Sequence, residues 1–357
     1  MTLQRLVVRD VRNLAHVELR PGSGLNLIVG HNASGKTSLL EAVHLLGLGR
    51  SFRTTQLRAI IRYGQATLTV FGEVAEPTGG LTTLGIEKSL ENTRIKVQGA
   101  VAASAAALAE RLPVVVLDPH SHALLEQGPR LRRQFLDWGA FHVEHGFLEH
   151  WQRYQRALRQ RNAALRTGRM REAAAWEPEL AQSGEAVAAA RAHYAEAAAR
   201  TIERTASELA GLDELVFSYQ RGWASERALL SSLEQGREGD RELGHTRQGP
   251  HRADLVIRWG GQPVAQALSR GQQKTLVAAM RLAQVRLLHE RSGPRCVVLA
   301  DDLAAELDPG HRRQVLDALL ASGAQVFVTA TEVGVIPVPD AEVRTFHVEH
   351  GQFTELV

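Results

Sequence analysis

The sequence contains the stretch Gly30-His31-Asn32-Ala33-Ser34-Gly35-Lys36-Thr37, which matches the pattern G-x-x-x-x-G-K-S/T. An apolar run over residues 24–29 precedes it and predicts a strand, and residues 38–46 carry apolar side chains at helical spacing. In this context the backbone N–H groups of the loop and the helix N-terminus face a bound phosphate. The sequence therefore predicts a P-loop that holds a nucleoside triphosphate through nine residues: Gly30, His31, Asn32, Ala33, Ser34, Gly35, Lys36, Thr37 and Ser38.

Two of these residues have a specific chemical role in a P-loop. Lys36 reaches the β- and γ-phosphates, and the hydroxyl of Thr37 is a ligand of Mg²⁺. The alternative is a glycine-rich turn that binds nothing. Two glycines, a lysine and a threonine at fixed spacing between a strand and a helix disfavour that alternative, so we expect ATP and Mg²⁺ as cofactors.

The composition is that of an ordinary globular protein. The chain has 357 residues, of which 44% are hydrophobic, and this suffices for two or three domains. Its single cysteine, Cys296, suits a reducing compartment. The sequence shows neither the apolar core of a signal peptide nor the run of ~20 apolar residues that a membrane span needs, so we expect a cytoplasmic protein. The net charge is only +3, so a surface for nucleic acid must be a local patch.

The order of strand and helix patterns predicts an α/β fold with a helical insertion. We expect a hairpin over residues 3–20 and an antiparallel meander between residues 67 and 97. Helical patterns dominate from about residue 120 to residue 250, and buried-strand patterns then return. The chain therefore divides into three expected segments, in which an ATPase lobe with an added antiparallel sheet encloses a mainly helical second lobe: 1–118, 119–295 and 296–357.

A second motif completes the predicted nucleotide site. The apolar run at residues 296–300 predicts a buried, central parallel strand, and it ends in Asp301 and Asp302. An acid at the carboxyl end of such a strand, beside a P-loop, is the Walker B arrangement that holds Mg²⁺. We assign the metal to Thr37 and Asp301, and we expect Asp302 to orient or deprotonate the attacking water. The predicted catalytic residues are thus Lys36, Asp301 and Asp302, whereas the alternative role for the two acids is a helix N-cap.

Residues 268–274, Leu-Ser-Arg-Gly-Gln-Gln-Lys, resemble the Leu-Ser-Gly-Gly-Gln signature of ABC-type ATPases, which include the chromosome-maintenance and Rad50 heads. The resemblance implies that Ser269, Arg270, Gly271 and Gln272 act in trans, on ATP held by the P-loop of another subunit, so that ATP joins two heads. It also implies that Asp308, in the segment 304–308, belongs to the D-loop that lines the seam between the heads. The alternative is that Ser269 only caps the helix that follows it.

The sequence departs from the ABC-type pattern at two places. Ala330 and Thr331 stand where a switch histidine is expected, after the strand at residues 325–329. No glutamine occupies the loop after residues 114–117, where Asp118 stands instead. We therefore expect slow hydrolysis.

Islands along nearly the whole chain resemble the bacterial RecF family of recombination mediators. They comprise residues 30–41 with 49–54, 128–137, 160–162, 249–255, and 269–274 with 301–308. The resemblance implies a P-loop ABC-type head without a coiled-coil arm, whose helical lobe carries the signature. It further implies a weak DNA-dependent ATPase that dimerises with ATP on DNA and, with RecR and RecO, helps load the RecA recombinase at gaps in damaged DNA.

Arginines concentrate in the helical segment and are candidates for binding DNA. Side chains at helical spacing can follow phosphates without reading bases. The alternative is a solvated helix face whose charge nearby glutamates balance. Aromatic residues are only 5% of the chain, which disfavours base stacking on single strands, so double-stranded or gapped DNA is the expected partner. The candidates are Arg130, Arg132, Arg133, Arg153 and Arg156.

Three other functions remain compatible with the motifs. A cytoplasmic ATPase subunit of an ABC transporter would share the P-loop and the signature, but such subunits usually carry the switch histidine and lack an arginine-rich insertion. A small-molecule kinase would have no use for Ser269. An ATP-sensing scaffold would bind nucleotide without hydrolysing it.

Overall fold

The computed structural model describes residues 1–76, 79–293, 296–303, 308–336 and 343–356. The chain forms two compact units. Unit 1 comprises residues 1–121, 208–210 and 274–357, and unit 2 comprises residues 122–207 and 211–273. Helix α10 (Arg270–Ser292) begins in unit 2 and continues in unit 1. The segment boundaries expected after residues 118 and 295 stay a prediction.

Unit 1 contains an antiparallel sheet with the strand order β2-β1-β4-β5-β6-β7. Alternate residues of β4 are buried, because successive side chains of a strand point to opposite faces. The predicted hairpin and meander are both confirmed by this sheet. Its strands are β1 (Thr2–Val11), β2 (Leu14–Leu19), β4 (Thr67–Ala75), β5 (Leu81–Ser89), β6 (Thr93–Val97) and β7 (Ala100–Val101).

The second sheet of unit 1 has the order β15-β14-β3-β13-β12-β8. All neighbours from β14 to β8 pair in parallel, and only β15 is antiparallel. Every residue of β3, β12 and β13 is buried, as expected for parallel strands that are covered on both faces. The central parallel strand predicted at residues 296–300 is confirmed. The strands are β3 (Leu25–Val29), β8 (Val114–Leu117), β12 (Val297–Ala300), β13 (Gln325–Ala330), β14 (Val343–Glu349) and β15 (Gln352–Leu356).

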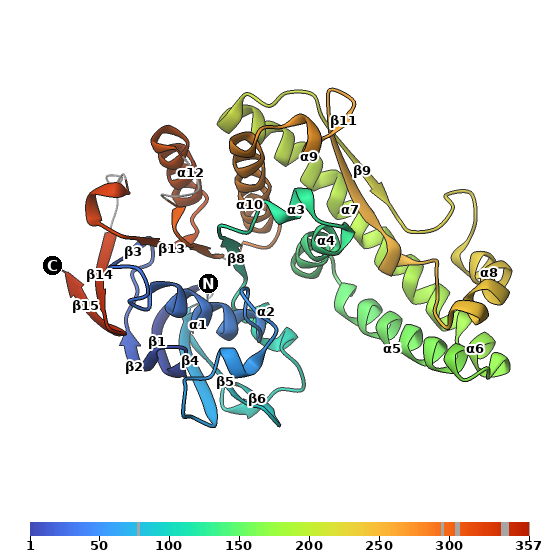
Figure 1. The fold of residues 1–357 in the computed structure, drawn as a ribbon, viewed down its shortest axis with the longest axis horizontal. Coiled ribbons are helices and arrows are strands. Elements are labelled where there is room, and N and C mark those ends of the chain that lie inside the picture. The colour runs from blue at the N-terminus through green and yellow to red at the C-terminus, as the bar shows by residue number, and fades with distance from the viewer. Residues whose placement is uncertain (77–78, 294–295, 304–307, 337–342, 357) are drawn as a thin grey trace. The chain divides into compact units, whose positions relative to one another are not determined.

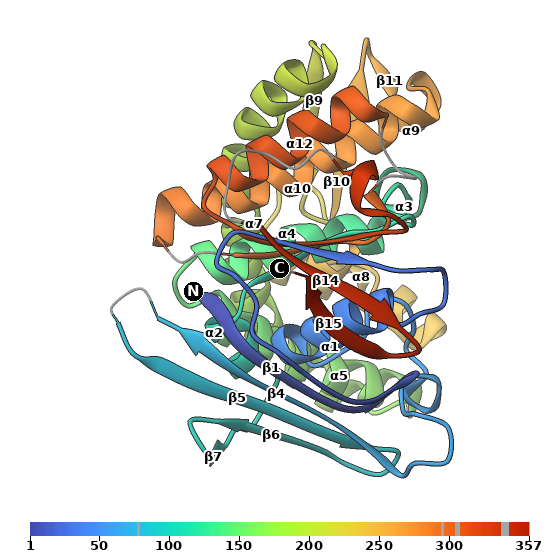
Figure 2. The ribbon, with the colours of Figure 1, turned by 90° about the vertical axis from the view of Figure 1, so that its left-hand side faces the viewer.

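Helix α1 (Lys36–Leu48) lies between these two sheets (Figures 1 and 2). Its side chains share one core with residues of both sheets, such as Val70 and Phe327. Because α1 begins where the P-loop ends, this core holds the loop in place. The other helices of unit 1 are η1 (Leu57–Ala59), α2 (Ala106–Arg111), α12 (Pro309–Ala321) and η3 (Val333–Val335), together with most of α10.

Unit 2 is mainly helical, as predicted, but it also contains a small sheet with the order β11-β10-β9. Its strands are β9 (Leu215–Gln220), β10 (Asp254–Trp259) and β11 (Gln262–Pro263). The sequence did not reveal β9, because the exposed Val216 interrupts the alternation of apolar and polar side chains in this strand. The helices are α3 (Ala123–Glu126), α4 (Pro129–Val143), α5 (Phe147–Arg166), α6 (Met170–Ala175), α7 (Glu177–Ala210), α8 (Leu229–Leu243), η2 (Pro250–Arg252) and α9 (Val264–Ala267).

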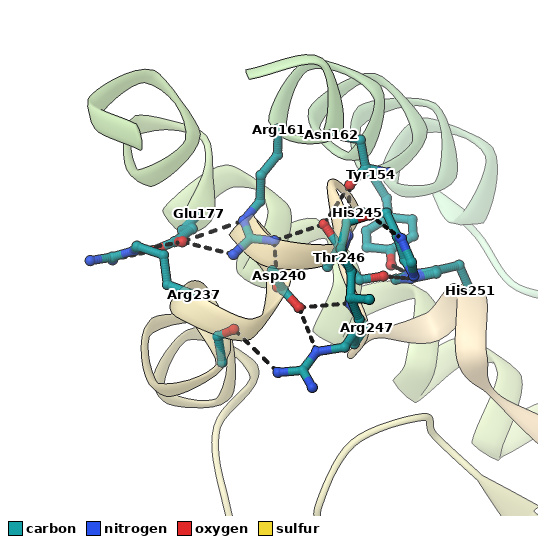
Figure 3. A network of polar contacts seen from close by, with 12 residues as sticks. Tyr154, Arg161, Asn162, Glu177, Arg237, Asp240, His245, Thr246, Arg247 and His251 are labelled. Carbon is teal, nitrogen blue, oxygen red and sulfur yellow. Dashed lines mark hydrogen bonds and ion pairs between the residues drawn. The ribbon is translucent and has the colours of Figure 1, made fainter. Parts of the chain in front are cut away.

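A buried network of charges joins α5, α7 and α8 (Figure 3). Arg161 is fully buried and forms ion pairs with Glu177 at 3.0 Å and with Asp240 at 2.8 Å. Each acid has a second partner, since Arg237 bonds to Glu177 and Arg247 bonds to Asp240, both at 3.0 Å. Charges that are removed from water need such partners, so the network is tied to one arrangement of these helices.

None of the helices in the described part of the chain is long and apolar enough to cross a membrane. Likewise, the described histidine, cysteine, aspartate and glutamate side chains form no group of three or more that could hold a metal ion.

Candidate nucleotide-binding site

The P-loop connects β3 to α1, as the sequence predicts, and two of its positions require glycine. A Cβ at Gly30 would lie 2.3 Å from the carbonyl oxygen of Val348. Gly35 has a φ of +124°, in the region that residues with a side chain rarely adopt. The loop therefore passes close to β14 and turns directly into the helix.

The Lys36 amine lies against the P-loop itself. Its Nζ donates to the carbonyl oxygens of Gly30 and His31, at 2.6 and 2.9 Å. Burial lowers the pKa of the Lys36 amine, and the negative charges of Asp302 and Asp301 oppose this shift. A partly buried ammonium group within an anion-binding loop is well placed to meet phosphate oxygens.

Ser34 supports the same role for the loop. Its hydroxyl is buried, and among the described residues it has no hydrogen-bond partner. A buried hydroxyl normally has a partner, so this one is available to a ligand oxygen that enters the loop, although Ser34 does not line the cavity described below.

The two halves of the predicted site meet at Asp301. Thr37 Oγ1 donates to Asp301 Oδ1 at 2.9 Å, although the two residues are 264 positions apart. Asp301 is only 8% exposed, at the carboxyl end of the buried strand β12. Burial raises the pKa of Asp301, while hydrogen bonds from Thr329 and Thr37 act in the opposite direction. The hydroxyl and the carboxylate thus form the pair of oxygens assigned to Mg²⁺.

A cavity of about 820 Å³ opens over this pair. Asp301 and Asp302 line it, together with six of the nine residues predicted to bind the nucleotide: Asn32, Ala33, Gly35, Lys36, Thr37 and Ser38. The other three, Gly30, His31 and Ser34, belong to the same loop but not to the cavity wall. The volume suits a nucleotide, since ligand pockets span ~300–1,000 Å³.

Several residues that line this cavity were not predicted from the sequence. Arg12 is held there by the fully buried Glu41, whose carboxylate accepts from Nε and Nη2 of Arg12 at 2.7 and 2.9 Å. Tyr63 also lines the cavity, although its side chain is 97% exposed. The sequence did hold a signal for the contact between Arg12 and Glu41, because Glu41 is an acid at the centre of a largely apolar helix. No pattern in the sequence pointed to Tyr63.

The signature residues lie at the start of α10. Ser269 caps this helix, because Ser269 Oγ accepts from the Gln272 backbone N–H at 3.3 Å and Gln272 Oε1 accepts from the Ser269 N–H at 2.9 Å. Ser269, Arg270 and Gly271 are exposed and Gln272 is partly buried. The helix-cap alternative is thus observed, and the action on a second subunit stays a prediction.

The predicted D-loop is only partly described, because residues 304–307 lie outside the described residues. Asp308 itself is the N-cap of α12, and its carboxylate accepts from the backbone N–H groups of Gly310 and His311. Its place at a dimer seam stays a prediction.

The five candidate DNA-binding arginines have different surroundings. Arg132 forms a bidentate ion pair with Asp254, at 2.7 and 3.0 Å, and Arg133 donates to the carbonyl oxygen of Ala253 at 2.8 Å. Arg153 forms a bidentate pair with Glu179, at 2.8 and 3.0 Å. Arg130 and Arg156 are exposed. The guanidinium groups of the first three residues are therefore engaged within unit 2, and the last two are the more accessible to phosphate.

Comparisons with known proteins establish the family. The model of the RecF/RecN/SMC N-terminal domain matches residues 2–354. A relative from Pseudomonas aeruginosa (strain UCBPP-PA14) is 46% identical over 361 residues, which cover 99% of this chain and 98% of the relative. A relative from Stutzerimonas stutzeri is 46% identical over 362 residues and is covered to 98%. Both are named DNA replication and repair protein RecF. The chain belongs to the RecF family.

Solved structures agree with RecF membership. The structure of the recombination mediator protein RecF-ATP in the RecFOR pathway has a TM-score of 0.89 at 26% identity and covers 99% of this chain and 97% of its own. An Smc head bound to the C-winged helix domain of ScpA has a TM-score of 0.60 at 13% identity, with 100% of this chain covered, and is similar in fold alone. The predicted ABC-type head with an added antiparallel sheet and a helical lobe is confirmed. The ABC-transporter alternative is not supported, because the similarity to RecF proteins extends along the whole chain.

Proposed function

We propose that this protein is a Mg²⁺-dependent ATPase of DNA repair and recombination that binds DNA in the cytoplasm. The observation that carries the ATPase is the contact of Thr37 Oγ1 with Asp301 Oδ1 at 2.9 Å, beneath the P-loop. A hydroxyl and a carboxylate at this distance are the ligands that Mg²⁺ takes in P-loop proteins. The relatives that are named RecF support the role in DNA repair.

The residues around this pair suit phosphoryl transfer to water. Bound Mg²⁺ neutralises phosphate charge and orients the γ-phosphate. Lys36 binds the β- and γ-phosphate oxygens once its amine leaves the carbonyl oxygens of Gly30 and His31. Asp302 faces the same cavity and orients or deprotonates the attacking water. Because Ala330 and Thr331 occupy the place of a switch histidine, turnover is slow.

A substitution of the P-loop lysine tests this chemistry. Lys36→Arg keeps the positive charge but displaces it, so we expect some nucleotide affinity and no hydrolysis, measured by ATP binding and by phosphate release. Full turnover in Lys36→Arg would refute the proposed site.

ATP binding drives the formation of a homodimer in which the signature of one subunit closes over the nucleotide of the other. The exposed N-terminus of α10 supports this arrangement, because Ser269 presents its hydroxyl there beside the backbone of a long helix. Ser269→Arg should leave ATP binding to the monomer intact and prevent ATP-dependent dimers in analytical ultracentrifugation. Ser231→Arg, at an exposed serine in the first turn of α8, is the matched control. Dimers of Ser269→Arg at the wild-type level would exclude action in trans.

Double-stranded or gapped DNA is the proposed nucleic-acid partner, and RecR and RecO are the proposed protein partners. The exposed Arg130 and Arg156 are the best placed to meet phosphates. Replacing both with alanine should weaken duplex binding and reduce the slope of log K against log salt by about 2, since each phosphate contact contributes ~0.9. Arg153→Ala, which removes an arginine paired with Glu179, should leave the slope unchanged. An unchanged slope in the double variant would place the DNA surface elsewhere.

A further inference from the structure

Thr329 belongs to β13 and contacts Asp301 and Asp302, two of the predicted catalytic residues. It is the penultimate residue of β13, and it is only 1% exposed. Its Oγ1 donates to Asp301 Oδ1 at 2.8 Å and accepts from the backbone N–H of Asp302, also at 2.8 Å. A hydroxyl has one hydrogen to donate and lone pairs to accept with, so one side chain can make both bonds.

The hydrogen bond from the Asp302 N–H to Thr329 Oγ1 fixes an unusual backbone conformation of Asp302. Asp302 has a φ of +50°, in the left-handed region that residues other than glycine seldom adopt. Such a conformation persists only where the surroundings enforce it. Both acids line the cavity, but in this conformation their surroundings differ, because Asp301 is buried beside Thr37 while Asp302 is exposed.

We propose that Thr329 is a positioning residue for ATP hydrolysis, which holds Asp301 toward the metal and the Asp302 backbone in the conformation that directs its carboxylate into the cavity. The inference rests on the proposed ATPase function. Through these two hydrogen bonds, Thr329 connects β13 to the two acids that follow the neighbouring strand β12. The next residues, Ala330 and Thr331, stand where ABC-type heads carry the switch histidine, and Thr331 lines the cavity. The Thr329 hydroxyl bonds the Asp301 carboxylate and the Asp302 backbone N–H. It therefore links the position of the switch histidine to the predicted catalytic acids.

Valine has nearly the shape of threonine but lacks the hydroxyl, so Thr329→Val removes both bonds at once. The Asp302 N–H then loses its partner, and Asp301 retains Thr37 as its only hydroxyl donor among the described residues. We expect kcat for ATP to fall about tenfold or more with a change in KM of less than about twofold. We also expect the Mg²⁺ concentration needed for half-maximal binding of a non-hydrolysable ATP analogue to rise several-fold. Thr329→Ser keeps the hydroxyl and should restore both values.

Thr82→Val is the matched control, because Thr82 is also a buried strand threonine of unit 1, with its hydroxyl bonded to Glu76. It should lower the thermal midpoint about as much as Thr329→Val does, yet leave kcat and the Mg²⁺ requirement unchanged.

The experiment measures steady-state ATP hydrolysis and Mg²⁺-dependent binding of the analogue for the four full-length proteins. If the wild type turns over ATP and Thr329→Val has the same kcat, the inference is wrong and the proposed ATPase stands. If the wild type binds Mg²⁺–ATP without hydrolysing it, the proposed ATPase function is wrong. In that case an unchanged Mg²⁺ requirement in Thr329→Val would also overturn the positioning role of Thr329. A wild type that does not bind Mg²⁺–ATP would refute both.

Discussion

Replacing Arg161 with methionine should destabilise unit 2 strongly, although the residue stands in a run of arginines that resembles a solvated surface. Its guanidinium is fully buried and bonds to Glu177, Asp240 and the hydroxyl of Thr246 (Figure 3). Methionine matches the length of the aliphatic stem and removes the charge, so both acids stay buried with one cationic partner fewer.

The structure sets the size of the expected loss. Removal of one member of a buried ion pair costs ~3–5 kcal/mol when the partner is left uncompensated. Here Arg237 still bonds to Glu177 and Arg247 still bonds to Asp240, so we expect the lower end of that range, about 3 kcal/mol. With a slope of ~2 kcal/mol per molar urea, the unfolding midpoint should fall by about 1.5 M.

Intrinsic tryptophan fluorescence measures this loss selectively, because all five tryptophans belong to unit 2: Trp138, Trp151, Trp176, Trp223 and Trp259. Arg153→Met is the control on the same helix, since Arg153 pairs with Glu179 at the surface, and its midpoint should hardly change. Equal shifts in the two variants, or no shift in Arg161→Met, would refute the reasoning.

Three further predictions concern single residues. Burial lowers the pKa of His44 from 6.5 to about 4, so its contribution to stability is complete above pH 6.5 and is lost as the pH falls toward 4. Between pH 7.5 and 5.5 the loss is about 1.4 kcal/mol, and urea unfolding followed by circular dichroism should show a smaller pH effect in His44→Gln; an equal effect would contradict the assignment. Gly139→Ala should lower the fluorescence midpoint far more than Gly236→Ala, because the new Cβ would lie 1.8 Å from the Tyr194 ring; similar midpoints would show that the ring moves aside easily. Asp301→Asn replaces a carboxylate whose pKa burial raises, so without nucleotide the thermal midpoint should not fall, whereas the rise on adding Mg²⁺–ATP should disappear; a rise of wild-type size would place the metal elsewhere.

Much of the nucleotide site could be predicted because its chemistry depends on local patterns. The P-loop combines a strand, glycines and a helix within some twenty residues, and Asp301 follows a wholly apolar strand. Parallel strands of one sheet bring their carboxyl ends to the same edge, which is why Thr37 and Asp301 meet. The approximate ranges of the strands and of the long helices followed from apolar periodicity in the same way.

Side-chain partners that are distant in the sequence could not be predicted. Arg132 looks like one member of a basic cluster, and its partner Asp254 is 122 residues away. The hydroxyl of Thr329 lies within an apolar strand pattern, and no motif in the sequence distinguishes it. A linear pattern records which residues are charged or polar, but the surrounding fold decides which of them meet phosphate, water or each other.

The strand that leads into the P-loop is synthesised long before the strands with which it pairs. β3 pairs with β13 and β14, and the hydrogen bond from Asn26 to Val326 spans 300 residues. At ~5–20 residues per second, the ribosome needs roughly 15–60 s to make that intervening chain. Throughout this interval the apolar segment Leu25–Val29 has no partner strand and can be bound by chaperones. A translation product that stops before β14 would therefore lack one of the two strands that flank β3, the strand that leads into the P-loop.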